Sequence, residues 1–251
     1  MMTHQLVLDI GNSRTKIGLF AEGRLIRASH LPNGDGAAAK VFLENDHVDR
    51  VVLGSVAAEA PDLITALASI APINVILGDS PSPLKSAYAT MSTLGVDRLA
   101  NAVGANLLFP DRPVLAVDLG TCVTYDLVDA SGTFLGGLIS PGLRMRAKAM
   151  NTFSARLPLV EPAENVSLIG RSTEECLASG THHGLLAELR SMITGIGQQQ
   201  PHLAVVLTGG DAPRFARALE NGIFAHPFLT LLGLHALSLH DSSFPRSAAA
   251  G

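Results

Sequence analysis

Residues Asp9 to Lys16 read Asp-Ile-Gly-Asn-Ser-Arg-Thr-Lys, and these residue types in this order are typical of a turn that binds phosphate. Gly11 lets the backbone bend tightly, and successive N–H groups in such a turn form a hollow that accepts an anion. The other polar residues add neutral donors and one positive charge: Asn12, Ser13, Thr15 and Lys16. The carboxylate of Asp9 would repel phosphate unless a divalent cation separates them, and Mg²⁺ is commonly held by carboxylates together with phosphate oxygens. The segment therefore predicts a phosphate site that uses a metal ion.

A second turn repeats this chemistry 109 residues later, where Asp118-Leu-Gly-Thr-Cys-Val-Thr124 follows an apolar run. With that shift Asp9 aligns with Asp118, and four further identities follow: Gly11 with Gly120, Thr15 with Thr124, Ala21 with Ala130 and Gly23 with Gly132. One Asp-x-Gly turn can simply end a strand, whereas two in matching halves indicate a duplicated domain. We therefore expect two copies of one domain, whose turns grip a polyphosphate from both sides.

The segment Gly95-Val-Asp97-Arg98 stands at the start of an expected helix and offers the chemistry of an acceptor site. The simplest interpretation is a structural ion pair between Asp97 and Arg98. Phosphoryl transfer to a hydroxyl also needs a group that orients the hydroxyl and takes its proton, and Asp97 suits that role. Arg98 suits an acidic group of the substrate, because a guanidinium binds a carboxylate through paired hydrogen bonds. The residues alone leave both interpretations open.

Two glycine-rich turns complete the set, and each follows an expected strand. Gly136-Gly-Leu-Ile-Ser-Pro-Gly142 precedes a helix whose first N–H groups could face phosphate. Thr208-Gly-Gly-Asp211 leaves room for a base or a ribose, although either segment could equally be an ordinary turn. The sequence has no Gly-x-x-x-x-Gly-Lys-Ser/Thr and no Gly-x-Gly-x-x-Gly after its first strand, which disfavours a P-loop protein and a Rossmann fold.

The elements that must position these turns can be predicted from periodicity and turn residues. Strands are expected at residues 5–9, 15–20, 24–31, 49–56, 74–77, 113–118, 123–128, 133–139 and 202–207. Helices are expected at residues 61–70, 98–109, 141–150, 172–197, 213–219 and 228–239. The helix over residues 172–197 could break near Gly180. The repeated order of strand, turn, strand, turn and strand predicts an α/β fold with an N-terminal domain of residues 1–112 and a C-terminal domain of residues 113–251.

Composition limits the classes of protein to which the chain can belong. The 251 residues are 47% hydrophobic and 16% charged, which allows a large core without disulfides. The net charge of −4 and the absence of a block of Lys and Arg argue against nucleic acid as a partner. Only two cysteines occur, the N-terminus has no signal-peptide pattern, and no uncharged apolar run approaches the roughly 20 residues of a membrane helix. We expect a cytoplasmic protein with no membrane partner.

These motifs resemble the type III pantothenate kinases of bacteria, which belong to the actin-like, ribonuclease-H-like phosphotransferases. The resemblance rests on five segments that stand in the family's order and span nearly the whole chain: residues 9–16, 95–98, 118–121, 136–142 and 208–212. It implies two tandem ribonuclease-H-like domains, with mixed sheets flanked by helices. The sequence departs from the family at Cys122, where a small Ala is usual. Because Cys is also small, we expect little effect.

The resemblance also implies a role for each site residue. ATP, with Mg²⁺, would be bound by Asp9, Ile10, Gly11, Asn12, Ser13, Arg14, Thr15, Lys16 and Thr121. Asp97 would accept the proton of the primary hydroxyl of pantothenate, and the other substrate residues would be Tyr88, Gly95, Val96, Arg98 and Thr173. Asp118 would bind a monovalent cation, potassium or ammonium. Members of the family are typically homodimers, with the substrate site near the subunit interface.

Residues and resemblance together lead to one hypothesis and two alternatives. The hypothesis is in-line transfer of the γ-phosphoryl group of ATP to pantothenate, the first step of coenzyme A biosynthesis, by positioning and charge stabilisation. The nearer alternative is another actin-like kinase that acts on a sugar or on acetate, although the segment Gly95 to Arg98 favours pantothenate. The other alternative is a regulatory protein that retains the kinase fold. Retention of Asp9, Asp97 and Asp118 argues against it, because a binding module needs no base beside a phosphate site.

Overall fold

The computed structural model describes residues 4–11, 14–55, 61–163, 165–219 and 222–241. The chain divides into two compact units. The first consists of described residues from 1–110, 132–135 and 228–251, and the second of described residues from 111–131 and 136–227. The units differ from the expected ranges 1–112 and 113–251 chiefly because the last helix of the chain returns to the first unit.

The first unit is built on a five-stranded mixed sheet in the order β3-β2-β1-β4-β5. Its strands are β1 (His4–Ile10), β2 (Thr15–Ala21), β3 (Arg24–Leu31), β4 (Arg50–Ser55) and β5 (Ile73–Ile76). β1, β2 and β3 form an antiparallel meander, whereas β4 runs parallel to β1 and β5 runs parallel to β4. Alternation along β1 puts Leu8 and Ile10 on one face of the sheet and Asp9 on the other.

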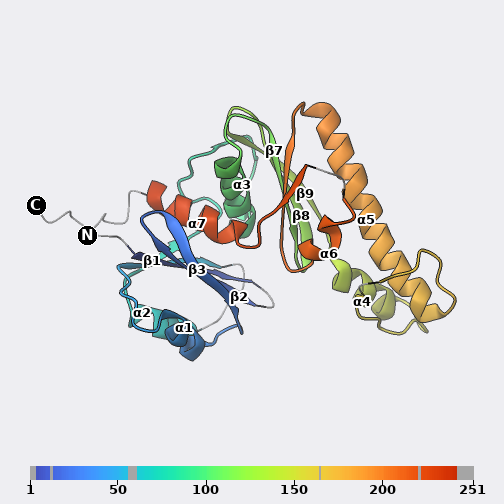
Figure 1. Ribbon diagram of the computed structural model, residues 1–251, viewed down its shortest axis with the longest axis horizontal. Coiled ribbons are helices and arrows are strands. Elements are labelled where there is room, and N and C mark those ends of the chain that lie inside the picture. Colours follow the sequence, from blue (N-terminus) through green and yellow to red (C-terminus); the bar gives the residue numbers. More distant parts are fainter. Residues whose placement is uncertain (1–3, 12–13, 56–60, 164, 220–221, 242–251) are drawn as a thin grey trace, which may run out of the picture. The chain divides into compact units, whose positions relative to one another are not determined.

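Helices cover both faces of this sheet. α1 (Gly36–Leu43) and α2 (Pro61–Ala68) pack against the face that carries Leu8, where their buried residues join one hydrophobic cluster. α3 (Val96–Leu108) and α7 (Leu229–His240) lie side by side, and α7 packs on β1 (Figure 1). α7 covers the face that carries Asp9, because a β-carbon at Gly54, the partner of Asp9 on β4, would lie 2.7 Å from the side chain of Leu234. The unit also contains β6 (Lys85–Ser86) and the 3₁₀ turn η1 (Met91–Thr93).

The second unit repeats this strand arrangement. Its strands are β7 (Val114–Leu119), β8 (Cys122–Val128), β9 (Thr133–Pro141), β10 (Ala204–Thr208) and β11 (Ile223–Ala225). With β6 paired to the start of β9, the sheet has the order β11-β10-β7-β8-β9-β6. The series β9-β8-β7-β10-β11 has the same order as β3-β2-β1-β4-β5. β10 runs parallel to β7 as β4 does to β1, and β11 runs parallel to β10 as β5 does to β4. The α/β class expected from the sequence is confirmed.

The helices of the second unit among the described residues are α4 (Leu143–Phe153), α5 (Thr173–Gln199) and α6 (Ala212–Ala216). The break considered near Gly180 does not occur, because α5 runs through that position. A glycine costs a helix about 1 kcal/mol, and several buried leucines outweigh that amount. Leu177, Leu185 and Leu189 are buried along α5. Ser172 caps the helix by accepting a hydrogen bond from a backbone N–H of its first turn.

Four short elements of the described chain were not expected from the sequence: α1, β6, η1 and β11. α1 begins within Gly34-Asp-Gly36, a sequence typical of a turn. Its start is fixed by Asp35, whose carboxylate accepts a hydrogen bond from the N–H of Ala38 at 2.8 Å. β6 and β11 have two and three residues, too few to show a period. Across the described residues, no helix is long and apolar enough to span a membrane.

Candidate active site

Asp9 and Lys16 face each other at the end of the first hairpin. They are direct partners across β1 and β2, so their side chains lie on the same face of the sheet. Nζ of Lys16 lies 3.3 Å from Oδ2 of Asp9, and the two side chains are only 15% and 7% exposed. Lys16 thus contacts the carboxylate of Asp9, a partner that its predicted role toward phosphate did not include. Two other predicted ATP residues, Asn12 and Ser13, lie outside the described residues.

Asn33 holds the described ends of the first turn together. The N–H of Gly11 donates to the carbonyl oxygen of Arg14 at 3.2 Å. The amide of Asn33 donates to the carbonyl oxygen of Gly11 at 2.8 Å, and its oxygen accepts from the hydroxyl of Thr15 at 3.0 Å. Thr15 is fully buried, so its hydroxyl braces the turn. The side chain of Ile10 belongs to the core and can serve a ligand only through its backbone, whereas Arg14 is exposed.

Asp97 occupies the second position of α3, after Gly95 and Val96. Its Oδ1 accepts a hydrogen bond from the N–H of Arg98 at 2.9 Å, so the carboxylate lies over the start of the helix. The helix dipole stabilises a negative charge at this end. A β-carbon at position 95 would lie 2.5 Å from Oδ1 of Asp97, which explains the glycine there. The half-buried carboxylate is therefore held in one orientation, as a proton acceptor requires.

Tyr88 and Arg98 meet beside this helix start. Arg98 is 6% exposed, and its guanidinium carbon lies 5.8 Å from the centre of the Tyr88 ring. The ring of Tyr88 also packs against that of Phe134, with centroids 5.7 Å apart. The structure thus brings Tyr88 to the segment Gly95 to Arg98 within the first unit. A guanidinium held on an aromatic face and largely out of water is well suited to bind a carboxylate.

Asp118 stands between two threonines in the second turn. It is the direct partner of Thr124 on β8 and of Thr208 on β10, so the three side chains form a row on one face of the sheet. Thr208 is fully buried and Thr124 is 9% exposed, and neither hydroxyl has a hydrogen-bond partner among the described residues. Buried hydroxyl groups normally have partners, so the row fits an oxygen-ligated cation. By strand pairing Thr124 corresponds to Lys16, whereas the ungapped shift aligned it with Thr15.

Glycines allow two other motifs to pack against this second turn. Gly209 has a φ of +91°, and a β-carbon there would collide with Oδ1 of Asp118 and lie 2.6 Å from the backbone of Leu119. The N–H of Gly142 donates to the carbonyl oxygen of Thr121 at 3.1 Å. A β-carbon on Gly142 would lie 2.6 Å from that same oxygen. The Thr-Gly-Gly and Ser-Pro-Gly motifs therefore both pack against the Asp-x-Gly turn of the second unit.

Comparison with known proteins decides the family. Residues 5–195 match the family model of type III pantothenate kinase. A type III pantothenate kinase of Porphyromonas gingivalis is 38% identical over 240 residues, which cover 94% of this chain and 98% of that protein. The chain belongs to the type III pantothenate kinase family. Kinases of this family use ATP together with a metal ion.

Solved structures similar to this member of the type III pantothenate kinase family confirm its fold. A Campylobacter jejuni protein, described as a Baf family transcriptional activator, has a TM-score of 0.61 at 21% identity and covers 95% of this chain and 100% of its own. A ROK family glucokinase from Streptomyces griseus, in complex with glucose and AMPPNP, has a TM-score of 0.51 at 13% identity, with coverage of 94% and 99%. At such identities the likeness shows the fold alone. With the repeated strand order, it confirms two tandem ribonuclease-H-like domains.

A charged network supports the Ser-Pro-Gly motif of this pantothenate kinase family member. Arg146 on α4 donates to Glu188 on α5, to Oγ of Ser140 at 2.8 Å and to the carbonyl oxygen of Pro141 at 2.8 Å. The hydroxyl of Tyr125 donates to Glu188 at 2.9 Å. Burial acts to raise the pKa of Glu188, but hydrogen bonds from Arg146, Ser140 and Tyr125 outweigh it and lower the pKa. Burial and the adjacent Glu188 raise the pKa of Tyr125. The ion pair of Arg146 and Glu188 thus holds the Ser-Pro-Gly turn in place through Ser140 and Pro141.

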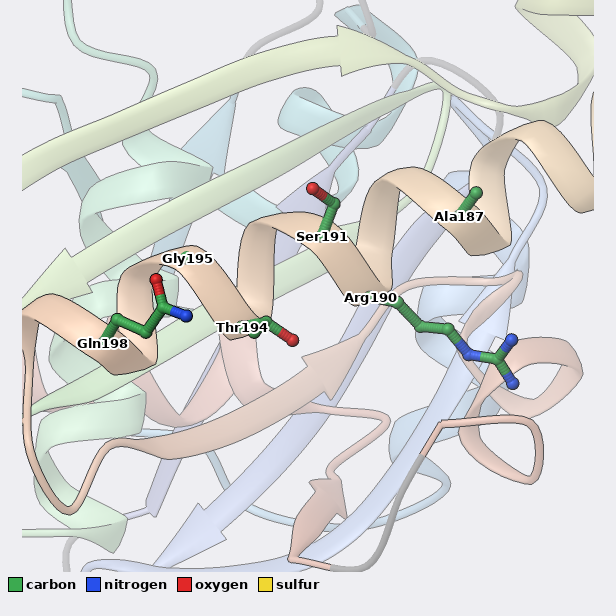
Figure 2. A pocket seen from close by; sticks show the side chains of 6 residues that line it. All are labelled: Ala187, Arg190, Ser191, Thr194, Gly195 and Gln198. Carbon is green, nitrogen blue, oxygen red and sulfur yellow. The ribbon is translucent and has the colours of Figure 1, made fainter.

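Thr173 is exposed as the first residue of α5, in the second unit. Further along the same helix lies a surface hollow of about 590 Å³, shown in Figure 2. One face of α5 lines it: Ala187, Arg190, Ser191, Thr194, Gly195 and Gln198. None of the predicted site residues contributes to this hollow, so it is a feature of the helix surface and not the proposed site.

Several residues that brace the site were not identified from the sequence: Asn33, Asn101, Arg146, Glu188 and Thr230. Asn101 had a usable signal, because it stands four residues after Asp97 and therefore on the same face of the helix. Thr230 had none, since its hydroxyl accepts a hydrogen bond from Lys16 across 214 residues of sequence. Pairing at that separation depends on the fold and leaves no local pattern.

Proposed function

We propose that this chain transfers the γ-phosphoryl group of ATP to the primary hydroxyl of pantothenate in the cytoplasm, giving 4′-phosphopantothenate and ADP. This reaction is the first step of coenzyme A biosynthesis. The observation that carries the proposal is the acceptor site on α3, where Asp97 is held over the helix start next to Arg98 and Tyr88. Similarity to a type III pantothenate kinase over nearly the whole chain supports the choice of substrate.

Asp97 is the proposed proton acceptor. In an in-line transfer the hydroxyl oxygen bonds to the γ-phosphorus while the bond from that phosphorus to the bridging oxygen breaks and ADP leaves. The proton of the hydroxyl passes to the carboxylate of Asp97. Because such transfers depend mainly on positioning, the fixed orientation of this carboxylate by Gly95 and the N–H of Arg98 supports the role.

The other substrate residues are proposed to bind the acidic end of pantothenate. Arg98 would pair with the carboxylate, and Tyr88 would hold the guanidinium in place and cover it from water. Gly95 and Val96 would line the same pocket through the start of α3. Thr173 is proposed as a further substrate contact on the strength of the resemblance.

ATP is proposed to bind through the segment from Asp9 to Lys16 and through Thr121. Asp9 would hold Mg²⁺, whose charge would neutralise that of the phosphates, and a carboxylate is the hard oxygen ligand that this ion prefers. Potassium or ammonium is proposed at Asp118. The hydroxyls of Thr124 and Thr208, which have no hydrogen-bond partner among the described residues, support that proposal, because these oxygen ligands stand on both sides of the carboxylate.

A homodimer is the proposed assembly, in line with the resemblance. Large apolar side chains are exposed at the end of α4 and in the segment before α5: Phe153, Leu168 and Ile169, at 89%, 67% and 75%. Surfaces of this kind support contact with a partner chain.

Replacement of the base is the decisive test of the reaction. Asp97→Asn should lower kcat for pantothenate by about 10²–10⁴-fold, because the amide cannot accept the proton, while binding of MgADP is retained. Asp62→Asn is the matched control, since Asp62 occupies the corresponding second position of α2 and is exposed. A coupled assay of ADP release, with the phosphorylated product identified by mass spectrometry, measures both.

The same assay separates the alternatives when pantothenate, sugars and acetate are compared as acceptors. Transfer to a sugar or to acetate in place of pantothenate would establish another kinase of the superfamily. Intact MgADP binding with no transfer to any acceptor would favour the regulator. Near-normal turnover of Asp97→Asn would remove Asp97 from the role of base while leaving the substrate assignment in place.

A further inference from the structure

A series of largely buried polar groups runs from Asp9 through α7 to α3 in the first unit. Nζ of Lys16, which contacts Oδ2 of Asp9, donates to Oγ1 of Thr230 at 3.0 Å. The hydroxyl of Thr230 donates in turn to Oδ1 of Asn101 at 2.9 Å. Thr230 is fully buried and Asn101 is 1% exposed. All four residues belong to the first unit and come from four elements: β1, β2, α7 and α3.

The direction of these hydrogen bonds is set by chemistry. An ammonium can only donate, so the oxygen of Thr230 must accept from Lys16. The single hydroxyl hydrogen of Thr230 is then used toward Asn101. Each group therefore orients the next, and polar contacts in a buried place are expensive to leave unmade. The series thereby restricts where the ammonium of Lys16 can lie.

The far end of this series reaches the helix that carries the proposed base. Asn101 stands on α3 one turn beyond Asp97 and faces the same side of that helix. The other end is Asp9, which belongs to the proposed metal and nucleotide site. α7, from the C-terminal part of the sequence, thus joins the nucleotide side and the acceptor side of the proposed reaction.

We propose that Thr230 is a positioning residue for the metal–nucleotide site: it holds Lys16, and through Lys16 it orients the carboxylate of Asp9 for MgATP. This inference rests on the proposed function, because it assigns Asp9 to the metal. It gives Lys16 a different task from the one expected of a cation beside phosphate. If the oxygen of Thr230 were absent, the ammonium would turn to its remaining partners, Asp9 first among them, and would compete there with the metal.

Three variants of α7 test the inference. Thr230→Val removes the hydroxyl at almost constant shape, and Thr230→Ser restores it. Ser238→Ala is the matched control, because Ser238 carries a buried hydroxyl on the same helix that lies within hydrogen-bond distance of Gln5 and of a carbonyl of its own helix, away from Lys16. Calorimetry gives the dissociation constant of ADP with Mg²⁺ and with EDTA for the full-length protein, and thermal unfolding reports stability.

The expected result is specific to the metal. Thr230→Val should bind MgADP roughly tenfold or more weakly, as loss of a hydrogen bond to a charged group implies, while binding of ADP in EDTA stays near the wild-type value. Thr230→Ser and Ser238→Ala should stay within about twofold of wild type in both conditions. Equal weakening with and without Mg²⁺, or equal behaviour of Thr230→Val and Ser238→Ala, would overturn the inference.

These outcomes are independent of pantothenate. A wild-type protein that binds MgADP but phosphorylates no pantothenate would disprove the proposed substrate, and the calorimetric comparison would still decide the role of Thr230. If the wild type phosphorylates pantothenate and Thr230→Val binds MgADP as tightly as the wild type, the proposed function stands and Thr230 has no positioning role in it.

Discussion

Two carboxylates of the proposed site depend on glycines that stand against them. Asp97 folds back over position 95, and Asp118 packs against position 209. A methyl group at either glycine would take the space of a carboxylate oxygen. At Gly95 the reason is space alone, whereas at Gly209 the positive φ adds a backbone requirement that L-residues rarely meet. The glycines of these motifs therefore serve the acidic side chains as well as any phosphate.

Gly209 and its neighbour Gly210 form a matched pair for a test. Gly209→Ala should destabilise the protein by about 1–3 kcal/mol, because a φ of +91° strains an alanine and the new β-carbon displaces Asp118. Activation of the kinase by potassium should be lost with it, since Asp118 is the proposed ligand. Gly210→Ala should change neither property, because a β-carbon there meets nothing within 4 Å.

Initial rates in potassium and in sodium, together with thermal unfolding, measure both effects of the Gly209 variant. A Gly209→Ala protein that keeps the wild-type ratio of rates in the two salts would show that Asp118 does not hold the cation. The unfolding data decide separately whether the glycine is required by the backbone.

Among the elements, α4 and α5 are tied to the end of β9 by one partly buried ion pair. Arg146→Met should remove the cation from Glu188, whose side chain is 22% exposed, at a cost of about 1–3 kcal/mol. Arg144→Met is the control on the same helix, since the pair of Arg144 with Glu161 is 80% and 76% exposed and should contribute at most about 0.5 kcal/mol. Urea denaturation measures the difference.

The KM values for ATP and pantothenate give a second test of the same two variants. The network holds the Ser-Pro-Gly turn that contacts Thr121, a proposed ATP residue. Arg146→Met should therefore raise KM for ATP while KM for pantothenate stays near its original value. Similar losses for Arg146→Met and Arg144→Met would show that the network does not support the nucleotide site.

Elements with a long period and clear turns could be predicted from the sequence. β1 was expected as a short buried strand, β2 and β3 as two strands joined by a hairpin turn at Glu22-Gly23, and the recurrence of Asp-x-Gly predicted the duplication seen in the two strand orders. α1 could not, because its start has the composition of a turn and depends on the cap from Asp35. The break left open near Gly180 does not occur for the opposite reason, since tertiary burial along α5 overrides a local preference.

The residues of the candidate site likewise fall into those that a local motif reveals and those that only the fold brings together. Residues within one motif, such as Asp97 after Gly95, could be found because their chemistry and spacing are local. Partners that meet only in the folded chain could not: Asn33 on the first turn, Thr230 on Lys16, and Glu188 on Arg146. The sequence therefore offers candidates for the reacting groups, whereas the residues that hold those candidates in place become visible only in the structure.

Across the whole molecule, the first unit is closed by residues from opposite ends of the chain. Nδ1 of His235 on α7 lies 3.0 Å from Oε1 of Gln5 on β1, and the hydroxyl of Ser238 donates to the same oxygen at 3.1 Å. The ring of His235 also stacks on Phe20, with centroids 4.3 Å apart. More than 200 residues separate α7 from β1, so this unit is complete only after the last described helix has been made.

The junction at His235 implies that stability falls in mild acid. Burial lowers the pKa of His235 from 6.5 to about 4. Between these values the unfolded chain takes up a proton that the folded chain excludes, so the free energy of unfolding is at its full value above pH 6.5 and falls as the pH is lowered toward 4. From pH 7.5 to pH 5.0 this residue alone should account for a loss of about 2 kcal/mol. Glu188, whose pKa is lowered, adds its own loss only at more acid pH.

Urea denaturation of wild type, His235→Gln and His240→Gln at the two pH values isolates this contribution. His235→Gln should be less stable at pH 7.5, because it loses the stack on Phe20, but should lose about 2 kcal/mol less on acidification. His240→Gln, exposed at the end of the same helix, should keep the wild-type dependence. Burial also lowers the pKa of His30 and His226, but they act equally in all three proteins and cancel in the comparison. Equal acid sensitivity of wild type and His235→Gln would mean that the folded protein accommodates a protonated ring at this junction.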